Sequence, residues 1–396
     1  MTRIMFFDPA LSGHHPEYIN HIVKYIVKDT KGANYYFVVN PELNKNFDDI
    51  KTLADSNPAI KIIEITPVEY KAIYSTGSLI KKSINEFRIM NSYAIKFNID
   101  HCFLLHVNNF QFALGLHKTK YTMHGILFGQ YTWQVFPNNF KGWLYKKRKE
   151  VQTKWMLRNK KLKGIFLLND TKSCGELNER YKTNVFKYLP DPVTDFQSET
   201  LFNLRSNYNI PSNHKIYLHV GSLEARKGTL DIIDALKYLD DEIRQNITIL
   251  IMGRSSIPFD LLIKQRIEEI NASFKVSIIY ENGYIANSRL KSIFEQIDFI
   301  LMPYKNTESS SGILGHAIIN KKLVIGPGDG LLGYLIAENK LGYLINPVNS
   351  MSIAKAITDC FYILSPEYQE DKIRNDYLRS HTSDVFANVI LSQIQL

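Results

Sequence analysis

The sequence predicts an α/β protein with two doubly wound domains, each a parallel sheet covered by helices on both faces. Three observations lead to this fold class. At 396 residues the chain is too long for one ordinary hydrophobic core. Short apolar runs alternate with longer helix-like segments, which is typical of βαβ units. The alternation stops at Pro190-Asp191-Pro192 and then starts again, which indicates a domain boundary.

We therefore expect one domain over residues 1–193, a second over residues 194–380, and a closing helix over residues 381–396 that packs back on the first domain. The strands expected in the first domain are Arg3–Phe7, Tyr35–Val39, Ile60–Ile65, Cys102–Val107, Lys120–Met123, Gly164–Leu168 and Phe186–Leu189. Those expected in the second are Lys215–Val220, Ile247–Met252, Val276–Tyr280, Phe299–Met302, Lys322–Ile325 and Gly342–Ile345. The helices expected between and after these later strands include Thr229–Leu239, Leu261–Ile270, Ser288–Gln296, Gly312–Ile319 and Ser352–Leu364.

Hydrophobic residues make up 45% of the chain and aromatic residues 12%, which is typical of a folded globular protein and not of a disordered one. The chain opens directly with a strand-like segment, so we expect no secretory signal. No apolar run approaches the length of a membrane span. Cys102, Cys174 and Cys360 have neither metal-site nor disulfide-framework spacing, which fits a reducing cytosol.

The net charge of +9 comes entirely from the first half of the chain. Residues 1–195 hold 28 Lys and Arg against 17 Asp and Glu, and the remaining residues hold 20 against 22. Residues 141–163 are especially basic, with ten Lys and Arg and one acid, Glu150. The apolar residues whose spacing places them on one helical face of this segment are Leu144, Val151, Trp155 and Leu162.

Three interpretations of this basic segment remain open. The helix could pack its apolar face on its own domain and keep a solvated basic side. It could instead form a membrane or acceptor surface, because Lys and Arg attract anionic lipid and Trp suits the interface. The residues of that surface would be Trp143, Lys146, Lys147, Arg148, Lys149 and Trp155. Nucleic-acid phosphate would attract the same charges, but this is the least favoured interpretation and we expect no nucleic-acid partner.

Two turns of the first domain attract a functional interpretation. Gly13 lies in the turn between the first strand and its helix, where a glycine lets backbone come close to a ligand. His124 follows the strand Lys120–Met123, so we expect it at the carboxyl end of that strand, facing the ligand crevice of the sheet. His106 ends the preceding strand and is the weaker candidate.

The second domain offers a phosphate-binding pattern. Gly221 and Ser222 leave a strand, and Arg226 and Lys227 follow just before a helix. Two cations beside a helix N-terminus suit a diphosphate. The next two strands end at Gly253-Arg254 and Glu281–Ile285, and such loops can form a wall for a nucleotide base and ribose.

A lone carboxylate occupies the loop after the strand Phe299–Met302. Pro303 ends this strand, and a Ser-rich turn leads to a helix that begins near Gly312. Glu308 therefore lies at the carboxyl end of a strand and just before a helix N-terminus, whose unpaired amides attract anions. Open α/β sheets bind their ligands at this edge.

Taken in order, these motifs resemble the donor domain of retaining GT-B glycosyltransferases, specifically glycosyltransferase family 4. The resemblance is strong over residues 215–360 and looser in the first half of the chain. The segments that carry it are His219–Gly228, Gly283-Tyr284-Ile285 to Asp298-Phe299, Pro303–Gly326 and Gly342–Pro347, with the Gly13 loop, His124-Gly125 and Pro190-Asp191-Pro192 in the first half.

This resemblance implies a GT-B fold, with two Rossmann-like domains facing across a cleft, the first binding the acceptor and the second the nucleotide sugar. Arg226 and Lys227 would hold the diphosphate, Glu308 would contact hydroxyls of the donor sugar, and His124 would lie near that sugar. Further donor contacts are expected from Gly13, Gly221, Ser222, Arg254, Gly283, Tyr284, Ile285, Ser311, Gly312, Ile313, Leu314 and His316. The family needs no metal, so we expect neither a metal nor a cofactor beside the nucleoside diphosphate sugar.

The implied activity is transfer of a sugar to a glycan or lipid-linked acceptor with retention of configuration, in cell-surface polysaccharide assembly. We expect a cytoplasmic enzyme that binds peripherally to the inner face of the plasma membrane. The family's second Glu, eight positions after the first, is His316 here, and its Gly-Phe-Gly is replaced by Ser309–Gly312. These departures leave two alternatives open: a catalytically silent GT-B subunit that binds a partner or glycan, and a sugar-nucleotide epimerase.

Overall fold

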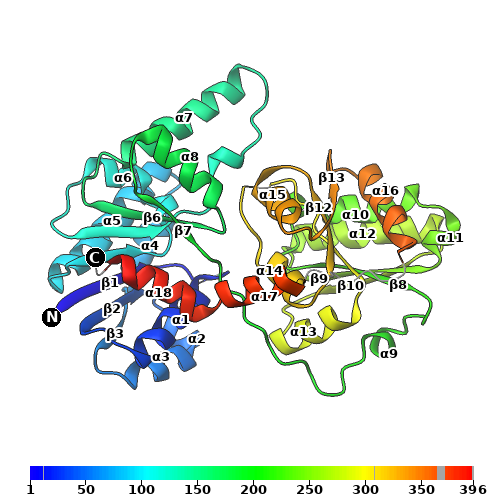
Figure 1. Cartoon of the computed structure of the whole chain (residues 1–396), viewed down its shortest axis with the longest axis horizontal. Helices are drawn as coiled ribbons and strands as arrows, with labels where there is room; N and C mark the ends of the chain where they lie inside the picture. The colour runs from blue at the N-terminus through cyan, green and yellow to red at the C-terminus, as the bar shows by residue number, and fades with distance from the viewer. Residues whose placement is uncertain (12, 307, 364–370, 395–396) are drawn as a thin grey trace. The chain divides into compact units, whose positions relative to one another are not determined.

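The computed structural model describes residues 1–11, 13–306, 308–363 and 371–394. The chain divides into two compact units (Figure 1). Unit 1 comprises Met1–Pro192 and His381–Leu396, and unit 2 comprises Val193–Ser380. Each unit is built on its own parallel sheet.

Unit 1 contains a seven-stranded parallel sheet with the strand order β3-β2-β1-β4-β5-β6-β7. Its strands are β1 (Thr2–Asp8), β2 (Ala33–Val39), β3 (Ile60–Glu64), β4 (His101–Leu104), β5 (Thr122–Ile126), β6 (Leu162–Leu168) and β7 (Phe186–Leu189). The order grows outward from β1 on one side and from β4 on the other, as in doubly wound folds. The carboxyl ends of β1 and β4 therefore form a topological switch point, where such sheets bind ligands.

Helices cover both faces of the unit 1 sheet. One face carries α1 (His15–Lys28), α3 (Asp48–Asp55) and α18 (Ser383–Ile394). The other carries α5 (Leu79–Lys96), α6 (Gln111–Leu116), the last turn of α7 (Phe140–Met156) and α8 (Thr171–Tyr181). The short helices α2 (Leu43–Asn46) and α4 (Pro67–Tyr74) complete the unit.

The C-terminal helix α18 belongs to unit 1, where it packs beside α1 (Figure 1). The rings of Tyr18 and Phe386 lie 4.9 Å apart, and Lys28 makes a 2.9 Å ion pair with Asp384. The chain therefore returns to its first unit after completing the second.

Unit 2 contains a six-stranded parallel sheet with the order β10-β9-β8-β11-β12-β13. Its strands are β8 (Lys215–Val220), β9 (Ile247–Gly253), β10 (Ser277–Asn282), β11 (Phe299–Leu301), β12 (Leu323–Pro327) and β13 (Gly342–Ile345). One face carries α9 (Leu204–Tyr208), α13 (Asn287–Gln296), α14 (Gly312–Ile319), α15 (Gly330–Glu338) and α17 (Asp371–Ser380). The other carries α10 (Thr229–Ala235), α11 (Asp241–Arg244), α12 (Ile257–Ser273) and α16 (Ser350–Phe361). Its switch point lies between β8 and β11.

The predicted fold class, two parallel α/β sheets with helices on both faces, is confirmed. Several predicted elements differ from the observed bounds, and three of these differences affect the functional interpretation. β5 continues to Ile126, so His124 lies in the middle of a strand and not at its end. β4 ends at Leu104. α7 ends at Met156, because the chain turns at Asn159 and enters β6 at Leu162.

The predicted apolar face of the basic segment is also wrong. Leu144 and Val151 are 53% and 64% exposed, and Leu162 belongs to a strand. The residues that α7 buries are Gly142, Thr153 and Met156. The predicted helix end at Leu364 lies outside the described residues.

Candidate functional site

Three consecutive strand ends of unit 2 are joined into one wall. The amide of Leu223, after β8, donates to the carbonyl oxygen of Arg254, after β9, at 2.7 Å. The amide of Gly283, after β10, donates to the carbonyl oxygen of Gly253 at 3.2 Å. The loops that follow β8, β9 and β10 therefore form a continuous surface at the carboxyl edge of the sheet.

Two glycines permit this close approach. Gly221 and Gly253 have φ of +119° and +140°, in the region that favours glycine. A Cβ on Gly253 would lie 1.8 Å from the carbonyl oxygen of Gly221. A Cβ on Gly221 would lie 3.2 Å from the Lys227 Nζ and 4.0 Å from Ile313 Cγ1. The Lys227 amine and the first turn of α14 therefore converge on the half-buried backbone of Gly221.

The two predicted cations differ in their environment. Lys227 is half-buried, and its amine lies over the ring of Tyr304, 4.9 Å from the centroid. Arg226 is exposed, and its Nε donates to Glu224 at 2.7 Å. Partial burial acts to raise the pKa of Glu224, but hydrogen bonds from Arg226 and Ser222 lower it overall. Glu224 therefore holds the Arg226 guanidinium at the mouth of the site.

Hydrogen bonds link the carboxyl ends of β8 and β11. The buried ring of His219 contacts the carbonyl oxygen of Leu301 at 2.9 Å and the hydroxyl of Thr229 at 3.0 Å. Burial lowers the pKa of His219 to about 4, so the ring is neutral and serves as a cross-link. The amide of Lys305 donates to the carbonyl oxygen of Arg226 at 2.7 Å. This bond links the loop that contains Arg226 and Lys227 to the loop that contains Glu308.

Glu308 lies partly buried in the loop that precedes α14, and its amide donates to Asn306 Oδ1 at 3.2 Å. The N-cap residue Ser311 makes no side-chain capping bond to this helix. The first amides of α14, at Gly312 and Ile313, carry the positive end of the helix dipole. Leu314 is buried in the sheet-facing core.

The remaining predicted donor residues fall into two places. Tyr284 is 66% exposed and stacks under the Arg254 guanidinium at 5.1 Å, while its neighbour Ile285 is buried in the core. The ring of His316 packs 6.1 Å from Phe196 and 5.8 Å from Phe294. His316 therefore packs between two aromatic rings of unit 2.

Sequence reasoning missed a polar pair at the switch point of unit 1. His15 Nδ1 lies 2.6 Å from Asp8 Oδ2, and Asp8 is buried at the end of β1. The ring of His15 also faces His106 at 5.6 Å. A carboxylate on Nδ1 fixes the ring and leaves Nε2 to contact a hydroxyl. The available signal was Asp8 as the last residue of a strand with two His in the following turn. Gly13, in the same turn, has open space around its Cα.

Two buried titratable groups of unit 1 have pKa values shifted far from their ordinary range. Burial raises the pKa of Glu86, on α5, to about 8, although Lys82 acts to lower it. Burial lowers the pKa of His124 to about 4, and the nearby His101 adds to this effect. His124 is 3% exposed, and its Nδ1 has no hydrogen-bond partner in the described part of the chain. It therefore lies inside the sheet packing and not at the ligand-binding edge.

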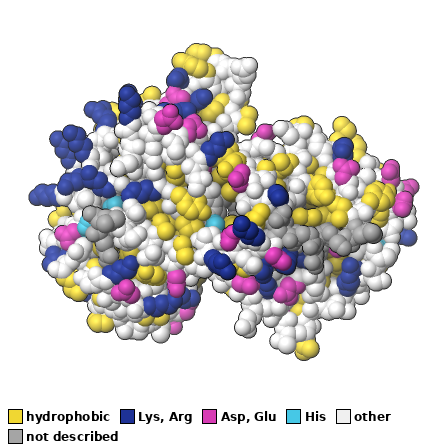
Figure 2. All heavy atoms as spheres, in the orientation of Figure 1, with side chains coloured by type: hydrophobic (Ala, Val, Ile, Leu, Met, Phe, Trp, Pro, Cys, Tyr) yellow, Lys and Arg dark blue, Asp and Glu magenta, His cyan; other side chains and the backbone are white. Residues whose placement is uncertain are grey.

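The N-terminal half of α7 projects an exposed apolar and basic surface. Phe140, Trp143 and Leu144 are 74%, 54% and 53% exposed, and Figure 2 shows hydrophobic side chains gathered at the tip of this helix. Of the lysines that follow them on the helix, Lys146 and Lys147 are exposed and Lys149 is half-buried. No helix within the described ranges has the length and apolar character needed to cross a membrane. Nor do these ranges contain a group of three or more His, Cys, Asp or Glu arranged to hold a metal.

Residues 202–377 match the family model described as Glycosyl transferases group 1. No curated protein sequence matches the chain significantly. Among solved structures, a glycosyltransferase from Rickettsia africae is 19% identical with a TM-score of 0.69, over 100% of this chain and 98% of the other. WaaG, a glycosyltransferase involved in lipopolysaccharide biosynthesis, is 13% identical with a TM-score of 0.65, over 100% and 99%. Anabaena HepE in complex with UDP and glucose is 13% identical with a TM-score of 0.67, over 100% of both chains.

These structures have the same two-sheet architecture, so the fold class is that of GT-B glycosyltransferases. The family match covers most of unit 2, including the wall of loops and the segment from Glu308 through α14.

Proposed function

We propose that the protein is a glycosyltransferase that moves a sugar from a nucleoside diphosphate sugar to an acceptor hydroxyl. One observation carries this proposal: the Gly221 backbone, the Lys227 amine and the first turn of α14 converge at the switch point of unit 2. The match of residues 202–377 to a glycosyltransferase model supports it. So does the fold shared with HepE, whose structure holds UDP and glucose.

In this proposal the donor diphosphate lies against Gly221, with Lys227 on one side and the amides of Gly312 and Ile313 on the other. These groups stabilise the charge that develops on the leaving diphosphate. Arg226 joins them by exchanging its partner Glu224 for phosphate. Exposed ion pairs such as Arg226–Glu224 contribute only about 0–1 kcal/mol, so the exchange costs little. Glu308 contacts hydroxyls of the donor sugar.

We further propose that the transfer retains the anomeric configuration and needs no metal. The bond from the anomeric carbon to the phosphate oxygen breaks through an oxocarbenium-like state. The acceptor oxygen attacks the same face, and its proton passes to the departing phosphate. Lys227, Arg226 and the α14 amides supply the positive charge for this step.

Unit 1 would bind the acceptor, which we propose to be a glycan or lipid-linked saccharide in cell-surface polysaccharide assembly. The Asp8–His15 pair can orient the acceptor hydroxyl. The exposed apolar tip of α7 and its lysines support peripheral attachment to the inner face of the plasma membrane. The kinship of fold with WaaG, an enzyme of lipopolysaccharide biosynthesis, agrees with such a role.

A panel of nucleotide sugars tests the proposal. With a competent acceptor, we expect release of a nucleoside diphosphate from one donor, and NMR of the product should show the donor's anomeric configuration. The position of His316 among aromatic rings favours one competing function, a silent GT-B subunit. A folded protein that neither binds nor turns over any donor would support that function. Interconversion of the free donor without acceptor would instead indicate an epimerase.

A further inference from the structure

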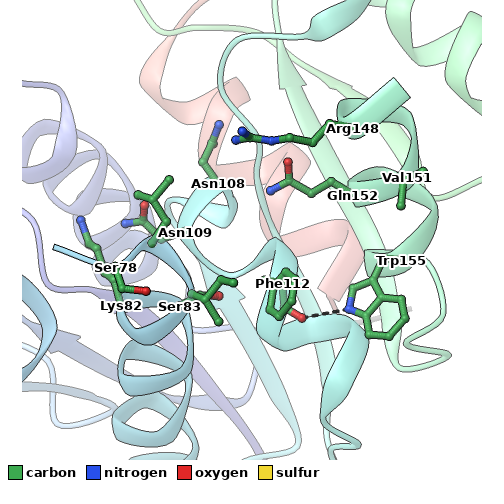
Figure 3. Close-up of a pocket in the computed structure, with 12 residues that line it drawn as sticks. Ser78, Lys82, Ser83, Asn108, Asn109, Phe112, Arg148, Val151, Gln152 and Trp155 are labelled. Carbon is green, nitrogen blue, oxygen red and sulfur yellow. Dashed lines mark hydrogen bonds between the residues drawn. The ribbon is translucent and has the colours of Figure 1, made fainter. Parts of the chain in front are cut away.

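Unit 1 contains a pocket of about 670 Å³ between α5, the 3-10 turn η1 (Val107–Asn109), α6 and α7 (Figure 3). All of its lining residues belong to unit 1. One part of the lining is polar and cationic, and the other is aromatic and aliphatic. The ligand that fits it must satisfy both parts.

The polar part is cationic and contains no acid. Lys82 comes from α5 and Arg148 from α7, and none of the described residues that line the pocket is Asp or Glu. The single acid of α7, Glu150, pairs with Lys147 at 2.8 Å and with Arg180 at 3.6 Å, so it does not neutralise Arg148.

Amide side chains complete the polar part. In Figure 3, Arg148 and Gln152 both extend from α7 toward Asn108. Asn109 joins them from the same side as Asn108. The Lys82 amine lies over the ring of Tyr74, 4.6 Å from its centroid. The Arg148 guanidinium and the amides of Gln152 and Asn108 share one end of the pocket, and such a group favours an anion with several oxygen atoms, such as phosphate.

The apolar part is built around a fixed indole ring. Trp155 Nε1 donates to the carbonyl oxygen of Phe112 at 3.2 Å, and the two rings lie 6.3 Å apart. Gly115 makes room for this ring, because a Cβ there would lie 2.2 Å from it. Val151 and Leu79 extend the surface and are 64% and 75% exposed. Exposed apolar side chains gathered around a pocket indicate a ligand with an apolar body.

The polar end of the pocket lies close to the Asp8–His15 pair. Asn108 exchanges two hydrogen bonds with the backbone of Phe128, at 2.7 and 2.9 Å. The ring of Phe128 lies 6.3 Å from that of His15. A ligand held by its anion near Asn108 can therefore present a neighbouring hydroxyl to His15.

We propose that this pocket binds a lipid-linked acceptor, with a phosphate group held by Arg148 beside Gln152 and Asn108, and the hydrocarbon chain against Phe112, Val151 and Trp155. The inference rests on the proposed function, because it names the substrate class for the acceptor side of that reaction. It predicts that neither the anion nor the chain alone accounts for the affinity. A phospholipid of the membrane carries the same chemistry, and the test separates the two sources.

The test is a titration of the full-length protein with farnesyl phosphate, farnesol and inorganic phosphate, followed by calorimetry. We expect farnesyl phosphate to bind at least about tenfold more tightly than the other two. Arg148→Met should weaken farnesyl phosphate binding about tenfold and leave farnesol unchanged, because it removes only the charge. Val151→Asp should weaken both amphiphiles. Val151 and Arg148 are both exposed, so these variants should remain folded.

Two matched controls change the same chemistry outside the pocket. Lys154→Met removes an exposed charge from the same helix, and Val68→Asp adds an acid at an exposed position of α4. Neither should affect farnesyl phosphate binding. Equal binding of farnesol and farnesyl phosphate, or equal effects of the Arg148 and Lys154 variants, would overturn the proposal. Binding of inorganic phosphate as tight as that of farnesyl phosphate would reduce the pocket to an anion site and also overturn it.

Phosphatidylglycerol vesicles distinguish an acceptor pocket from a membrane contact. Arg148→Met should leave most of the vesicle binding intact, because the exposed lysines of α7 remain. Complete loss of vesicle binding in this variant would assign the pocket to membrane phospholipid instead. These titrations need no donor. Farnesyl phosphate binding without donor binding would refute only the proposed transfer, and sugar transfer without farnesyl phosphate binding would refute only this inference.

Discussion

Replacing Glu86 by Gln should stabilise the protein at alkaline pH and not at acidic pH. Burial raises the pKa of Glu86 from the ordinary value of 4.5 to about 8. One of its oxygens, Oε2, has no hydrogen-bond partner in the described part of the chain. The folded state therefore holds the proton more tightly than the unfolded state does. Stability is full below pH 4.5 and falls as the pH rises toward 8.

The size of this effect follows from the two pKa values. Each unit between them corresponds to about 1.4 kcal/mol, so the full interval from 4.5 to about 8 corresponds to roughly 5 kcal/mol. Relaxation around the charged group reduces this figure, and we expect a gain of about 2–5 kcal/mol for Glu86→Gln at pH 8.5. At pH 4.5 the gain should be close to zero, because both side chains are then neutral in the folded state.

Urea unfolding at pH 4.5 and pH 8.5, followed by circular dichroism, measures the difference. Glu179→Gln is the matched control, because Glu179 is an exposed residue of α8 in the same unit. It should show no pH-dependent gain. A Glu86 variant that loses stability at pH 8.5, or gains equally at both pH values, would refute the reasoning.

Three further predictions concern the two switch points. Gly253→Ala should lower the stability of unit 2 by about 2–4 kcal/mol in thermal unfolding, because its Cβ would lie 1.8 Å from the Gly221 carbonyl oxygen. The control Gly283→Ala should leave stability unchanged, because a Cβ at Gly283 would meet open space. Equal losses of stability in the two variants would contradict the close approach of Gly253 to Gly221. Lys227→Met should weaken UDP binding about 30- to 100-fold in calorimetry with little change in Tm. The control Lys275→Met, which removes an exposed charge, should leave UDP binding unchanged. An unchanged Kd for the Lys227 variant would contradict the role assigned to Lys227. His15→Gln should lower kcat about 10²-fold while leaving UDP binding unchanged, and Asp8→Asn should act in the same direction; full activity of both variants would show that the pair does not touch the acceptor.

The strands could be predicted because strands buried on both faces of a sheet appear as continuous apolar runs. Lys215–Val220 is such a strand and is observed at the predicted bounds, as are the partly buried edge strands Phe186–Leu189 and Gly342–Ile345. β5 was placed too early because His124 and Gly125 interrupt its apolar run, although Ile126 continues it. A polar residue inside a strand is indistinguishable in sequence from one at the end.

The interpretation of α7 failed for a different reason. Periodicity identifies residues that share a helical face, but it does not show which face another element covers. Thr153 is buried, and its hydroxyl is satisfied by donating to the carbonyl oxygen of Lys149, whereas Val151 remains exposed beside the pocket. The pocket combines residues from α5, η1, α6 and α7, so no local pattern could have indicated it.

The unit 2 site was more accessible to sequence reasoning, because its parts lie in consecutive loops at strand ends. Gly221, Lys227 and Ile313 could be named from their motifs. Their convergence could not be predicted, because it brings together the loops after β8 and β11, which are neighbours only in the folded sheet. The contact of His316 with Phe196 and Phe294 likewise joins three separate segments and has no local signature.

Binding of a nucleoside diphosphate at the Gly221–Lys227–α14 convergence is tested most directly by calorimetric titration of the purified protein with UDP, GDP and their sugars. We expect at least one of them to bind with a stoichiometry of one, to bind more weakly as salt rises, and to lose most of its affinity in a Lys227→Met, Arg226→Met double variant. A well-folded protein that binds none of these nucleotides, or a double variant that binds them as tightly as the unaltered protein, would contradict the assignment of this edge as the donor site.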